Sequence, residues 1–525
     1  MTPKASIQSY LRQAYLLGLL MVAVGLTLSP FLMGMSQFWL VIVWVADGIC
    51  TKSFKEKLTR FWHNKAAVLL VAFYLMHVVG LLWTSDFQYA MKDLRVKLPI
   101  LVMPLVVSGM EPLDCKRFNF VMLVYVLSVF VATLFSFSTY VRHDYTDIRE
   151  ISRFISHIRF CLHMVFCMAV IGYYLVSRQA PWWSRLLQGA LLIWFACQIY
   201  IFESLSGYVI FAAVLAVSAL YTFLQWKKGM GWRIGIAIAA MAILIAGTML
   251  MVHRVKPLMD VKPVDFSALE KKTALGNDYW HDTVYNPIED GKWVGLYYCR
   301  KELQESWPQR SDIPFEGQTL NGENLEATLA RYMTSKDLRK DAEGVAALTD
   351  EDIRNIEQGV ANYYNWKHPG LQARLSSTLF EYNLYRRYNN PNGGSLSQRL
   401  EFTRASFHLI GQHPWFGVGT GDVPQAFSRA YDEINSPLKE EFRFRAHNQY
   451  LAIAVAFGLV GLVFFLVVLL YPYLFFKKHR TYLYTVFLCI VLLSMFPEDT
   501  LETQAGATLF AFFEALLLLA VPKGS

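Results

Sequence analysis

The sequence predicts an all-α protein that crosses a membrane about twelve times and carries one large, mainly helical domain outside the bilayer. Three observations predict this fold. Of the 525 residues, 54% are hydrophobic and only 17% are charged, which is too apolar for a soluble chain of this size. The apolar residues gather in segments of about 20, the length that spans a bilayer. Lysine and arginine are distributed unequally among the intervening loops.

Twelve segments are apolar enough to be candidate membrane-spanning helices. They lie near residues 14–30, 36–50, 66–84, 96–110, 118–140, 158–176, 185–202, 205–224, 232–252, 450–475, 481–496 and 504–521. The first segment follows Lys4 and Arg12 and resembles a signal peptide in its charge. Because "LTLSPFLMG" contains no small-x-small cleavage site, we expect an uncleaved first helix.

Basic residues in the connecting loops orient these spans. If both termini are cytoplasmic, four basic clusters lie on the cytoplasmic side, as the positive-inside rule requires. The clusters are Lys52 to Lys65, Lys116 with Arg117, Lys227 to Arg233, and Lys477 to Arg480. The net charge of +8 then follows from membrane topology, so we expect membrane lipids and no nucleic acid as partners.

This orientation divides the chain into three predicted parts. Residues 1–252 form an N-terminal membrane domain, and residues 450–525 form a C-terminal membrane domain. Residues 253–449 form one block outside the cytoplasm, irregular with short strands up to about 320 and helical afterwards. Of seven cysteines, only Cys299 lies in this block. No disulfide can form within the block, so its fold depends on packing.

Arginines also occur on the predicted exported side, where the positive-inside rule disfavours them. They lie at the head of the fourth span, before the sixth, before the tenth, and on the helix that leads to the tenth: Arg95, Arg159, Arg445 and Arg399. Arginine suits a diphosphate because its planar fork makes paired hydrogen bonds and keeps its charge. We expect the set to hold an anion. For any single arginine, the alternative is snorkelling or an ion pair with a local acid such as Asp93, Asp144 or Glu150.

His447 stands at the head of the tenth span, two residues after Arg445 and directly before Asn448. On a helical wheel, Ala454, Gly458 and Gly461 fall on the same side as His447, and a stripe of small residues favours close helix packing. An imidazole takes up a proton readily near neutral pH. His447 is therefore a candidate general base held in a fixed position; a solvated or capping histidine is the alternative.

The segment "IGQHPWFGVGTGD", residues 410–422, is rich in glycine. Gly417, Gly419 and Gly421 superficially resemble a nucleotide-binding fingerprint. The segment follows no predicted strand and opens no βαβ unit, so a Rossmann site is a poor interpretation. We expect a compact turn that lines the site.

Taken together, these residues resemble the O-antigen ligase family, within the superfamily that also contains O-antigen polymerases and protein O-oligosaccharyltransferases. The family's motif is His, then Asn, Ser or Gln, nine residues, Gly, two residues, and Gly, Thr or Tyr. His447, Asn448, Gly458 and Gly461 match it in full. The segments "SLSQRLEFTRASFHLIGQHPWFGVGTGD", "GLLWTSDFQYAMKDLRVKLPILVMPL" and "ISHIRF" are similar to other family blocks. Residues 258–370 depart from the family as a long insertion, which resembles Bacteroidetes members.

The resemblance implies a GT-C-type membrane glycosyltransferase of lipopolysaccharide biosynthesis, in the bacterial inner membrane with its site facing the periplasm. Its donor is expected to be a glycan on undecaprenyl diphosphate, and its acceptor a hydroxyl of lipid A-core. The reaction is expected to invert the anomeric centre without a metal or other cofactor. His447 is the expected base. The expected holders of diphosphate or glycan are Arg95, Arg159, Arg399, Arg445 and Asn448, and the expected structural glycines are Gly417, Gly419, Gly458 and Gly461.

Two alternatives stay open at this point. An O-antigen polymerase or a protein O-oligosaccharyltransferase uses the same donor chemistry. A lipid-linked-glycan transporter or flippase, from another class, accounts for ionisable residues in or near spans, such as His77, His163, Glu203 and Glu514. The sequence lacks the paired Gly/Pro-broken helices, in matching halves, that inverted-repeat transporters tend to have.

Overall fold

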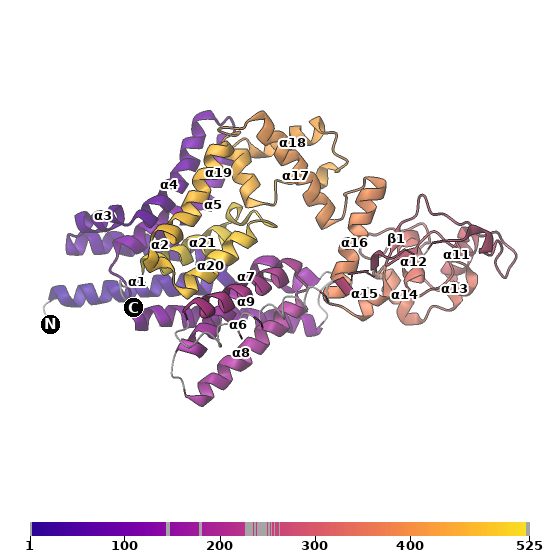
Figure 1. Ribbon diagram of the computed structural model, residues 1–525, viewed down its shortest axis with the longest axis horizontal. Helices are drawn as coiled ribbons and strands as arrows, with labels where there is room; N and C mark the ends of the chain where they lie inside the picture. The colour runs from indigo at the N-terminus through magenta and orange to yellow at the C-terminus, as the bar shows by residue number, and fades with distance from the viewer. Residues whose placement is uncertain are drawn as a thin grey trace. The chain divides into compact units, whose positions relative to one another are not determined.

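The computed structural model describes residues 3–142, 148–177, 181–225 and 263–520, with scattered residues between 235 and 261 (Figure 1). The chain packs into two compact units. Unit 1 contains Met1–Ala237, Arg399–Ser436 and Arg443–Ser525, and unit 2 contains Ile238–Gln398 and Pro437–Phe442. The predicted boundaries near 252 and 449 mark where the chain is expected to pass from the membrane to the exported block. The two units are instead groups of residues that pack together, so their bounds differ from the predicted ones.

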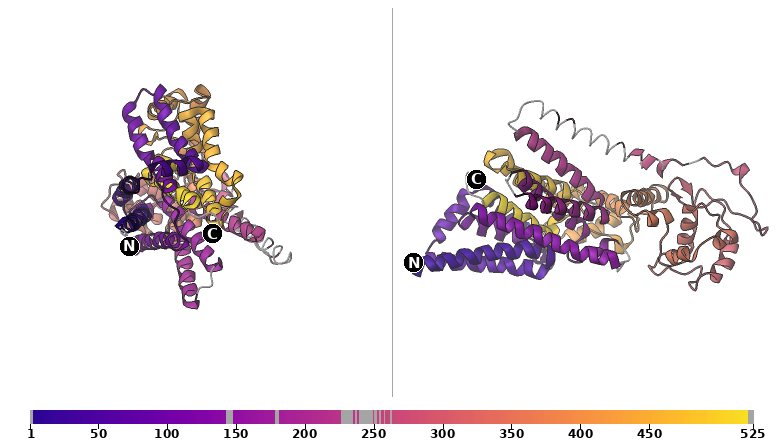
Figure 2. Two further views of the ribbon diagram at one scale, coloured as in Figure 1. Left: turned by 90° about the vertical axis from the view of Figure 1, so that its left-hand side faces the viewer. Right: turned by 90° about the horizontal axis from the view of Figure 1, so that it is seen from below.

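Unit 1 is built from long apolar helices. Within the described residues, eight helices are long and apolar enough to cross a membrane. These are α1 (Pro3–Leu28), α2 (Pro30–Thr51), α4 (Lys65–Val79, extended by η1 at Gly80–Trp83), α6 (Cys115–Arg142), α7 (His157–Ser177), α8 (Trp182–Ile201), α9 (Leu205–Gln225) and α19 (Gln449–Phe475). Figure 2 shows that many of them run side by side. The predicted all-α, multi-pass class is confirmed.

Three further predicted spans are also helices. They are α5 (Phe87–Gly109), α20 (Tyr482–Ser494) and α21 (Gln504–Leu519). With 13 and 16 residues, α20 and α21 are short for a span, and α5 carries several charges in its first turns. The predicted span near 232–252 lies almost entirely outside the described residues. The number twelve and the GT-C class therefore remain predictions.

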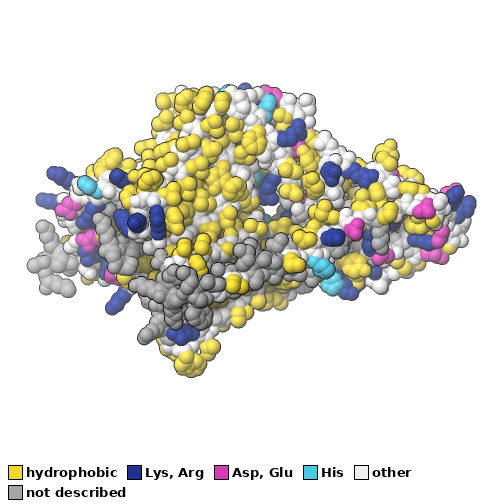
Figure 3. All heavy atoms as spheres, viewed as in Figure 1, with side chains coloured by type: hydrophobic (Ala, Val, Ile, Leu, Met, Phe, Trp, Pro, Cys, Tyr) yellow, Lys and Arg dark blue, Asp and Glu magenta, His cyan; other side chains and the backbone are white. Residues whose placement is uncertain are grey.

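The centre of unit 1 is α21. Every residue from Gly506 to Leu519 is buried, which is the pattern of a helix surrounded by protein on all sides. It packs against α5, which in turn packs against α4, and α4 packs against α19 (Figure 1). Hydrophobic side chains cover most of the surface over α4 and α19 in the view of Figure 3. An apolar surface of this extent is typical of a protein that faces lipid.

Shorter elements complete unit 1 and position its charged residues. They are α3 (Phe54–His63), η2 (Ile148–Ile151), α17 (Ser395–Gln412), α18 (Val423–Glu433), η6 (Lys477–His479) and η7 (Thr500–Glu502). The first residues of α17, up to Gln398, belong to unit 2.

Unit 2 has a hydrophobic core of its own, centred on Trp307, Leu329, Tyr332, Met333 and Ile356. The described helices of unit 2 are η3 (Phe266–Ala268), α11 (Arg300–Ser306), η4 (Trp307–Gln309), α12 (Leu325–Ser335), α13 (Ala342–Ala346), α14 (Asp350–Glu357), α15 (Tyr363–Lys367), α16 (Leu371–Tyr388) and η5 (Glu440–Phe442). Strands β1 (Ile288–Glu289) and β2 (Lys292–Trp293) form a small antiparallel hairpin. The insertion predicted from the sequence therefore has a hydrophobic core and secondary structure, as a small folded domain does.

Candidate active site

Charged side chains of unit 1 gather around the short connection between α20 and α21. This connection, residues 495–503, contains η7 and three carboxylates, Glu498, Asp499 and Glu502. Their partners come from α5, α7, α17 and the residues just before α19. The cations form two groups that differ in how closely they approach these carboxylates.

The first group is named the histidine cluster here and consists of Arg159, Arg399, His447, Glu498 and Asp499. Glu498 lies between two guanidinium groups, with Oε2 3.5 Å from Nη2 of Arg159 and Oε1 3.7 Å from Nη2 of Arg399. Nδ1 of His447 lies 3.8 Å from Oδ1 of Asp499. Residues from four separate parts of the chain thus meet at one place.

The ion pairs of the histidine cluster are loose. Charge-assisted hydrogen bonds between a guanidinium and a carboxylate are about 2.7–2.9 Å long, and these pairs are longer. The Nε atoms of Arg159 and Arg399 are buried and have no hydrogen-bond partner among the described residues. Burial raises the pKa of Glu498, although Arg159 lowers it. The cluster therefore has N–H donors without a hydrogen-bond partner next to a carboxylate whose ionised form is disfavoured by burial.

The second group is named the lysine cluster and consists of Tyr89, Asp93, Lys97, Gln449 and Glu502. Lys97 is completely buried, and its Nζ donates to Oδ1 of Asp93 at 2.5 Å and to Oε2 of Glu502 at 2.8 Å. Burial raises the pKa of Glu502, but Lys97 and then Arg445 outweigh it and lower that pKa to about 2. Glu502 therefore stays ionised, and its pair with Lys97 is tight.

Arg445 joins the two clusters. Its Nη1 donates to the Tyr89 hydroxyl at 2.9 Å and to Oε2 of Glu502 at 3.2 Å, while its Nη2 lies 3.4 Å from Oδ2 of Asp499. Gln449 braces the same connection, because it donates to Glu502 and accepts the N–H of Leu501 at 2.7 Å. The backbone on either side of His447 is thereby anchored to the α20–α21 connection.

His447 itself adopts an unusual backbone conformation, with φ +45°, in the left-handed region that few residues other than glycine enter. Its ring stacks on Phe402 at a centroid distance of 5.4 Å and meets Phe444 edge to face at 6.1 Å. The side chain is still 36% exposed. The imidazole is thus held by Asp499 and two aromatic rings while remaining accessible.

Asn448 is the N-cap of α19. Its Oδ1 accepts the N–H of Leu451 at 3.0 Å, and its Nδ2 donates to the carbonyl of Phe496 at 3.0 Å. An N-cap asparagine stabilises a helix start by satisfying an otherwise free N–H. These contacts give Asn448 a structural task, and its predicted contact with substrate remains a prediction.

One group of side chains in the described part of the chain has the composition of a metal site. The donor atoms of His447, Glu498 and Asp499 lie within 4.8 Å of one another. Three guanidinium groups, from Arg159, Arg399 and Arg445, pair with the two carboxylates of this group. These guanidinium groups place positive charge directly beside both carboxylates, which disfavours a divalent cation at this position.

Comparison with protein families places this geometry in a known group. The model of the O-antigen ligase family matches residues 370–466, a segment that includes Arg399, Arg445, His447 and the glycine-rich turn. Residues 370–466 of the chain are therefore similar to the O-antigen ligase family. The resemblance predicted from the histidine motif is therefore confirmed. No curated protein matches the chain.

Members of the O-antigen ligase family are glycosyltransferase-like enzymes, ligases and polymerases, whose substrates are in general a lipid-linked glycan and an acceptor. In this chain, the glycines that match the family motif have a structural role that the helical wheel did not reveal. The helix α19 is broken at Gly458, which has φ +65° and ψ −167°. The expected stripe of small residues on a continuous helix is thus wrong for this position.

The glycine-rich turn of the ligase family fills that break. The N–H groups of Leu459 and Val460 donate to the carbonyls of Pro414 at 2.8 Å and Trp415 at 3.3 Å. In return, Val418 and Gly419 donate to the carbonyls of Val455 and Ala456, each at 2.9 Å. A Cβ at residue 458 would lie 2.2 Å from the backbone of Trp415. Only glycine permits this approach.

The remaining motif glycines also lie where chains approach closely. Added Cβ atoms would lie 2.4 Å from the backbone of Ala456 at Gly417, and 2.7 Å from Oγ1 of Thr84 at Gly419. Gly461 lies on α19 opposite Met76 of α4. The turn also contributes Thr420 to a small cavity of about 20 Å³ beside Lys97 and Arg445. The turn therefore supports the lysine cluster from behind.

Arg95 is not part of either cluster. It is exposed on α5, and no ion pair joins it to another described residue. Lys97 lies two residues later, about 200° further round the helix, and faces Asp93 and Glu502 instead. The basic group that this segment contributes is therefore Lys97, because Arg95 projects from the opposite face of α5.

The residues that sequence reasoning missed are the carboxylates of the α20–α21 connection. The segment "FPEDTLE" attracts attention in the sequence only because it has no lysine or arginine. The positive-inside rule gives Asp and Glu little weight, so three acids in five residues carry no signal under it. The available signal was that Arg159, Arg399 and Arg445, if buried, need acidic partners.

Proposed function

We propose that this protein transfers a glycan from undecaprenyl diphosphate to an acceptor hydroxyl at the periplasmic face of the inner membrane. The observation that carries the proposal is the convergence of Arg159, Arg399 and Arg445 on the carboxylates beside His447. The three cations come from different elements and meet next to an accessible imidazole. This is the arrangement that a reaction with a diphosphate leaving group needs.

In this proposal, Arg159 and Arg399 bind the donor diphosphate. Their loose pairs with Glu498 and their unpartnered Nε–H groups leave donors for phosphate oxygens. A diphosphate carries more negative charge than one carboxylate, so it competes well with Glu498 for both guanidinium groups. The two arginines then hold the additional charge that develops on the leaving group.

His447 acts as the general base. With Nδ1 facing Asp499, its Nε2 is available to take the proton of the acceptor hydroxyl. The hydroxyl oxygen forms a bond to the anomeric carbon as the bond from that carbon to the diphosphate oxygen breaks. Undecaprenyl diphosphate leaves with the electron pair, and Asp499 stabilises the imidazolium. A single in-line displacement inverts the anomeric centre, and no step requires a metal.

The preferred acceptor is a hydroxyl of lipid A-core, because the ligase histidine motif is complete. An O-antigen polymerase or a protein O-oligosaccharyltransferase uses the same cluster with another hydroxyl. Glycan analysis of a deletion strain separates them. Loss of polymer from lipid A-core supports the ligase, single repeat units on the core indicate a polymerase, and missing protein glycans indicate the third activity.

The transporter alternative gains no support from the buried ionisable residues. His163 is hydrogen-bonded to the hydroxyl of Tyr125 at 2.8 Å, and Glu514 accepts from Tyr484 at 3.2 Å. His77 contacts the rings of Phe73 and Phe457. These are contacts within and between helices, which is a structural role for such groups in a membrane protein.

The proposal is tested with the purified full chain in lipid nanodiscs, supplied with undecaprenyl-diphosphate-linked glycan and lipid A-core. His447→Ala is expected to lower the transfer rate by a factor of about 100 or more, the usual contribution of a general base. The matched control is His408→Ala, since His408 on α17 pairs with Glu433 and lies outside the cluster. Transfer by His447→Ala at the rate of the wild type would remove the base and the mechanism with it.

A further inference from the structure

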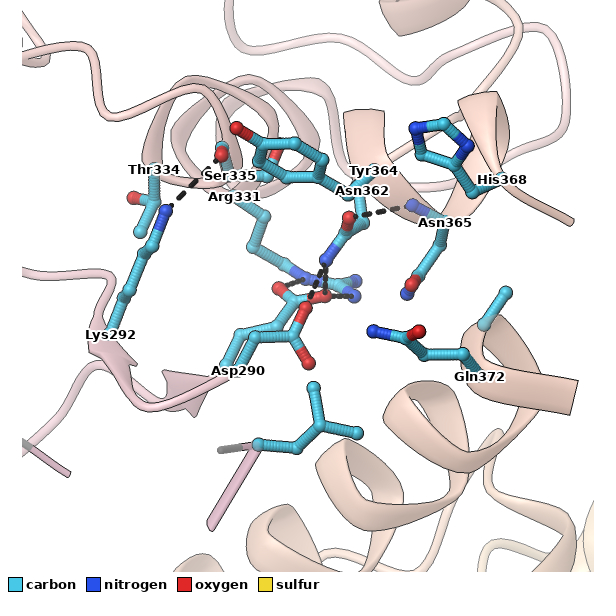
Figure 4. A pocket seen from close by; sticks show the side chains of 13 residues that line it. Asp290, Lys292, Arg331, Thr334, Ser335, Asn362, Tyr364, Asn365, His368 and Gln372 are labelled. Atoms are coloured by element: carbon cyan, nitrogen blue, oxygen red, sulfur yellow. Dashed lines mark hydrogen bonds and ion pairs between the residues drawn. The ribbon is translucent and has the colours of Figure 1, made fainter. Parts of the chain in front are cut away.

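Unit 2 contains a pocket of its own, with a volume of about 560 Å³ (Figure 4). The β1–β2 hairpin, α12, α15 and the start of α16 form its walls. All of its lining residues belong to unit 2. Most of the pocket is therefore made by the insertion predicted at residues 258–370, which has no part in the proposed chemistry.

The floor of the pocket is the tip of the hairpin. Asp290 and Gly291 form its two-residue turn with φ +48° and +75°, the signs of a type I′ turn, for which Asp-Gly is a preferred sequence. Glu289, just before the turn, is 5% exposed. Its carboxylate accepts Nε and Nη2 of Arg331 at 2.8 and 2.9 Å, and Nδ2 of Asn362 at 3.0 Å. The floor is thus a closed, bidentate ion pair.

Asp290 is fixed as firmly. Its Oδ2 accepts Nδ2 of Asn362 at 2.9 Å, and its Oδ1 accepts the hydroxyl of Ser376 at 2.6 Å. Asn362 also caps α15 by accepting the N–H of Asn365 at 3.1 Å. Three helices therefore hold the polar atoms of the floor in place, which is the organisation expected of a binding site rather than of a solvent-filled gap.

The charges of the lining are balanced. Arg331 is paired with Glu289, and Nζ of Lys292 lies 2.7 Å from Asp337 and donates to the carbonyl of Ser335 at 3.3 Å. Each cation already has a carboxylate partner, so the pocket has no surplus charge for a phosphate group. The carboxylate oxygens are occupied by N–H and O–H donors, so a metal ion has no free ligand set. The lining suits an uncharged polar ligand.

The rim adds planar groups. Tyr364 is 49% exposed, and its ring forms part of the wall. In Figure 4 the amide ends of Asn365 and Gln372 point toward the centre of the pocket, where Arg331 and Asp290 lie. Amide, carboxylate and guanidinium groups hydrogen-bond to hydroxyls as donors and acceptors. An exposed aromatic face packs against the C–H face of a sugar ring.

We propose that this pocket binds a short, uncharged stretch of glycan, with one sugar ring packed on Tyr364 and its hydroxyls bonded to Asn365 and Gln372. The volume lies within the usual range of small-ligand pockets, about 300–1,000 Å³. The inference rests on the proposed function, which supplies two glycans to this chain. One is the glycan of the lipid-linked donor, and the other is the core oligosaccharide of the acceptor.

The test measures equilibrium binding to the full chain in lipid nanodiscs by saturation-transfer NMR and titration. Two probes are used separately: the donor glycan released from undecaprenyl diphosphate by mild acid, and the core oligosaccharide released from lipopolysaccharide. Tyr364→Ala is expected to raise Kd about tenfold by removing the aromatic contact. Gln372→Ala is expected to raise it about fivefold by removing a hydrogen bond.

Matched controls keep the result specific. Trp366→Ala removes an exposed aromatic residue from the same short helix, and Gln358→Ala removes an exposed glutamine of unit 2; neither residue lines the pocket. Both controls are expected to bind as the wild type does. Binding of one probe alone supports the proposal and identifies its source as donor or acceptor.

Two results would overturn the inference: neither probe binds, or both pocket variants bind as the wild type does. The outcome is separate from that of the proposed function. His447→Ala is expected to keep the wild-type Kd for the glycan while losing transfer. An active His447→Ala variant with normal glycan binding would reject the mechanism and leave the pocket intact.

Discussion

The histidine cluster and the lysine cluster are built from the same kinds of groups but hold them differently. In the lysine cluster, Lys97 and Glu502 are 2.8 Å apart and share hydrogen bonds with Asp93, Arg445 and Gln449. In the histidine cluster, the arginines stand 3.5 and 3.7 Å from Glu498. Charges at hydrogen-bond distance have all their partners, whereas those held further apart keep donors for a ligand. Under the proposed function, this difference in distance distinguishes a structural ion network from a binding site.

The comparison predicts unequal losses of stability when each cluster loses its central carboxylate. Glu502→Ala removes a carboxylate partner from the buried Lys97 and from the partly exposed Arg445, which is expected to cost about 3–5 kcal/mol of unfolding free energy. Glu498→Ala removes only loose pairs, so its cost is expected to be a small fraction of that. Thermal unfolding in detergent measures both, and equal losses would mean that the two clusters do not differ.

The support behind the lysine cluster is tested at the break in α19. Gly458→Ala forces a Cβ against the backbone of Trp415 at a φ of +65°, and a strained residue of this kind costs about 1–3 kcal/mol. Gly411→Ala is the control, because nothing lies within 4 Å of a Cβ added there. The melting temperature should fall for the first variant only. An unchanged melting temperature for Gly458→Ala would show that the turn can move aside.

The donor-binding task of the histidine cluster is tested by Arg159→Lys. The substitution keeps the charge but loses the planar fork, so KM for the lipid-linked donor is expected to rise about tenfold. Arg153→Lys is the control, because Arg153 is exposed just before α7. Initial rates at varied donor concentration give the result. An unchanged KM in Arg159→Lys assigns this arginine to structure.

The smallest effect concerns pH. The folded pKa of Glu502, about 2, lies below its ordinary value of 4.5, so its stabilising contribution is present above that value and is lost as the pH falls toward 2. Burial raises the pKa of Glu498 and of Asp499. Their contribution has the opposite sign: it is present at low pH and is lost as the pH rises through the raised values.

Melting curves of Glu502→Gln and Glu498→Gln at several pH values check these signs. The melting temperature of the wild type should exceed that of Glu502→Gln by less as the pH falls. Relative to Glu498→Gln, the melting temperature of the wild type should fall as the pH rises. Parallel curves for the two variants would contradict the opposite directions of the two shifts.

Much of the fold could be predicted from the sequence, because long apolar runs have few structures open to them in lipid. Eleven of the twelve predicted segments lie on helices described by the structure. The break at Gly458 could not be predicted, since it depends on Pro414 and Trp415 supplying carbonyls from another part of the chain. A helical wheel contains no such partner.

The site was predicted only in part, because some of its residues carry a signal in the sequence and others do not. Arg159, Arg399 and Arg445 were identified because basic residues violate a topological rule, and His447 because it begins a recognisable motif. Glu498, Asp499 and Glu502 violate no rule. Lys97 was not among the predicted site residues, because the sequence does not reveal which face of α5 meets the α20–α21 connection.

The buried position of Lys97 has a consequence for the biogenesis of the protein. Glu502 follows Lys97 by 405 residues, so the ribosome delivers the carboxylate long after α5 has left it. During that interval, Asp93, one turn away on the same helix, is the partner within reach of this ammonium group. The half-made protein thus carries an ion pair into lipid that only the finished C-terminal helices enclose.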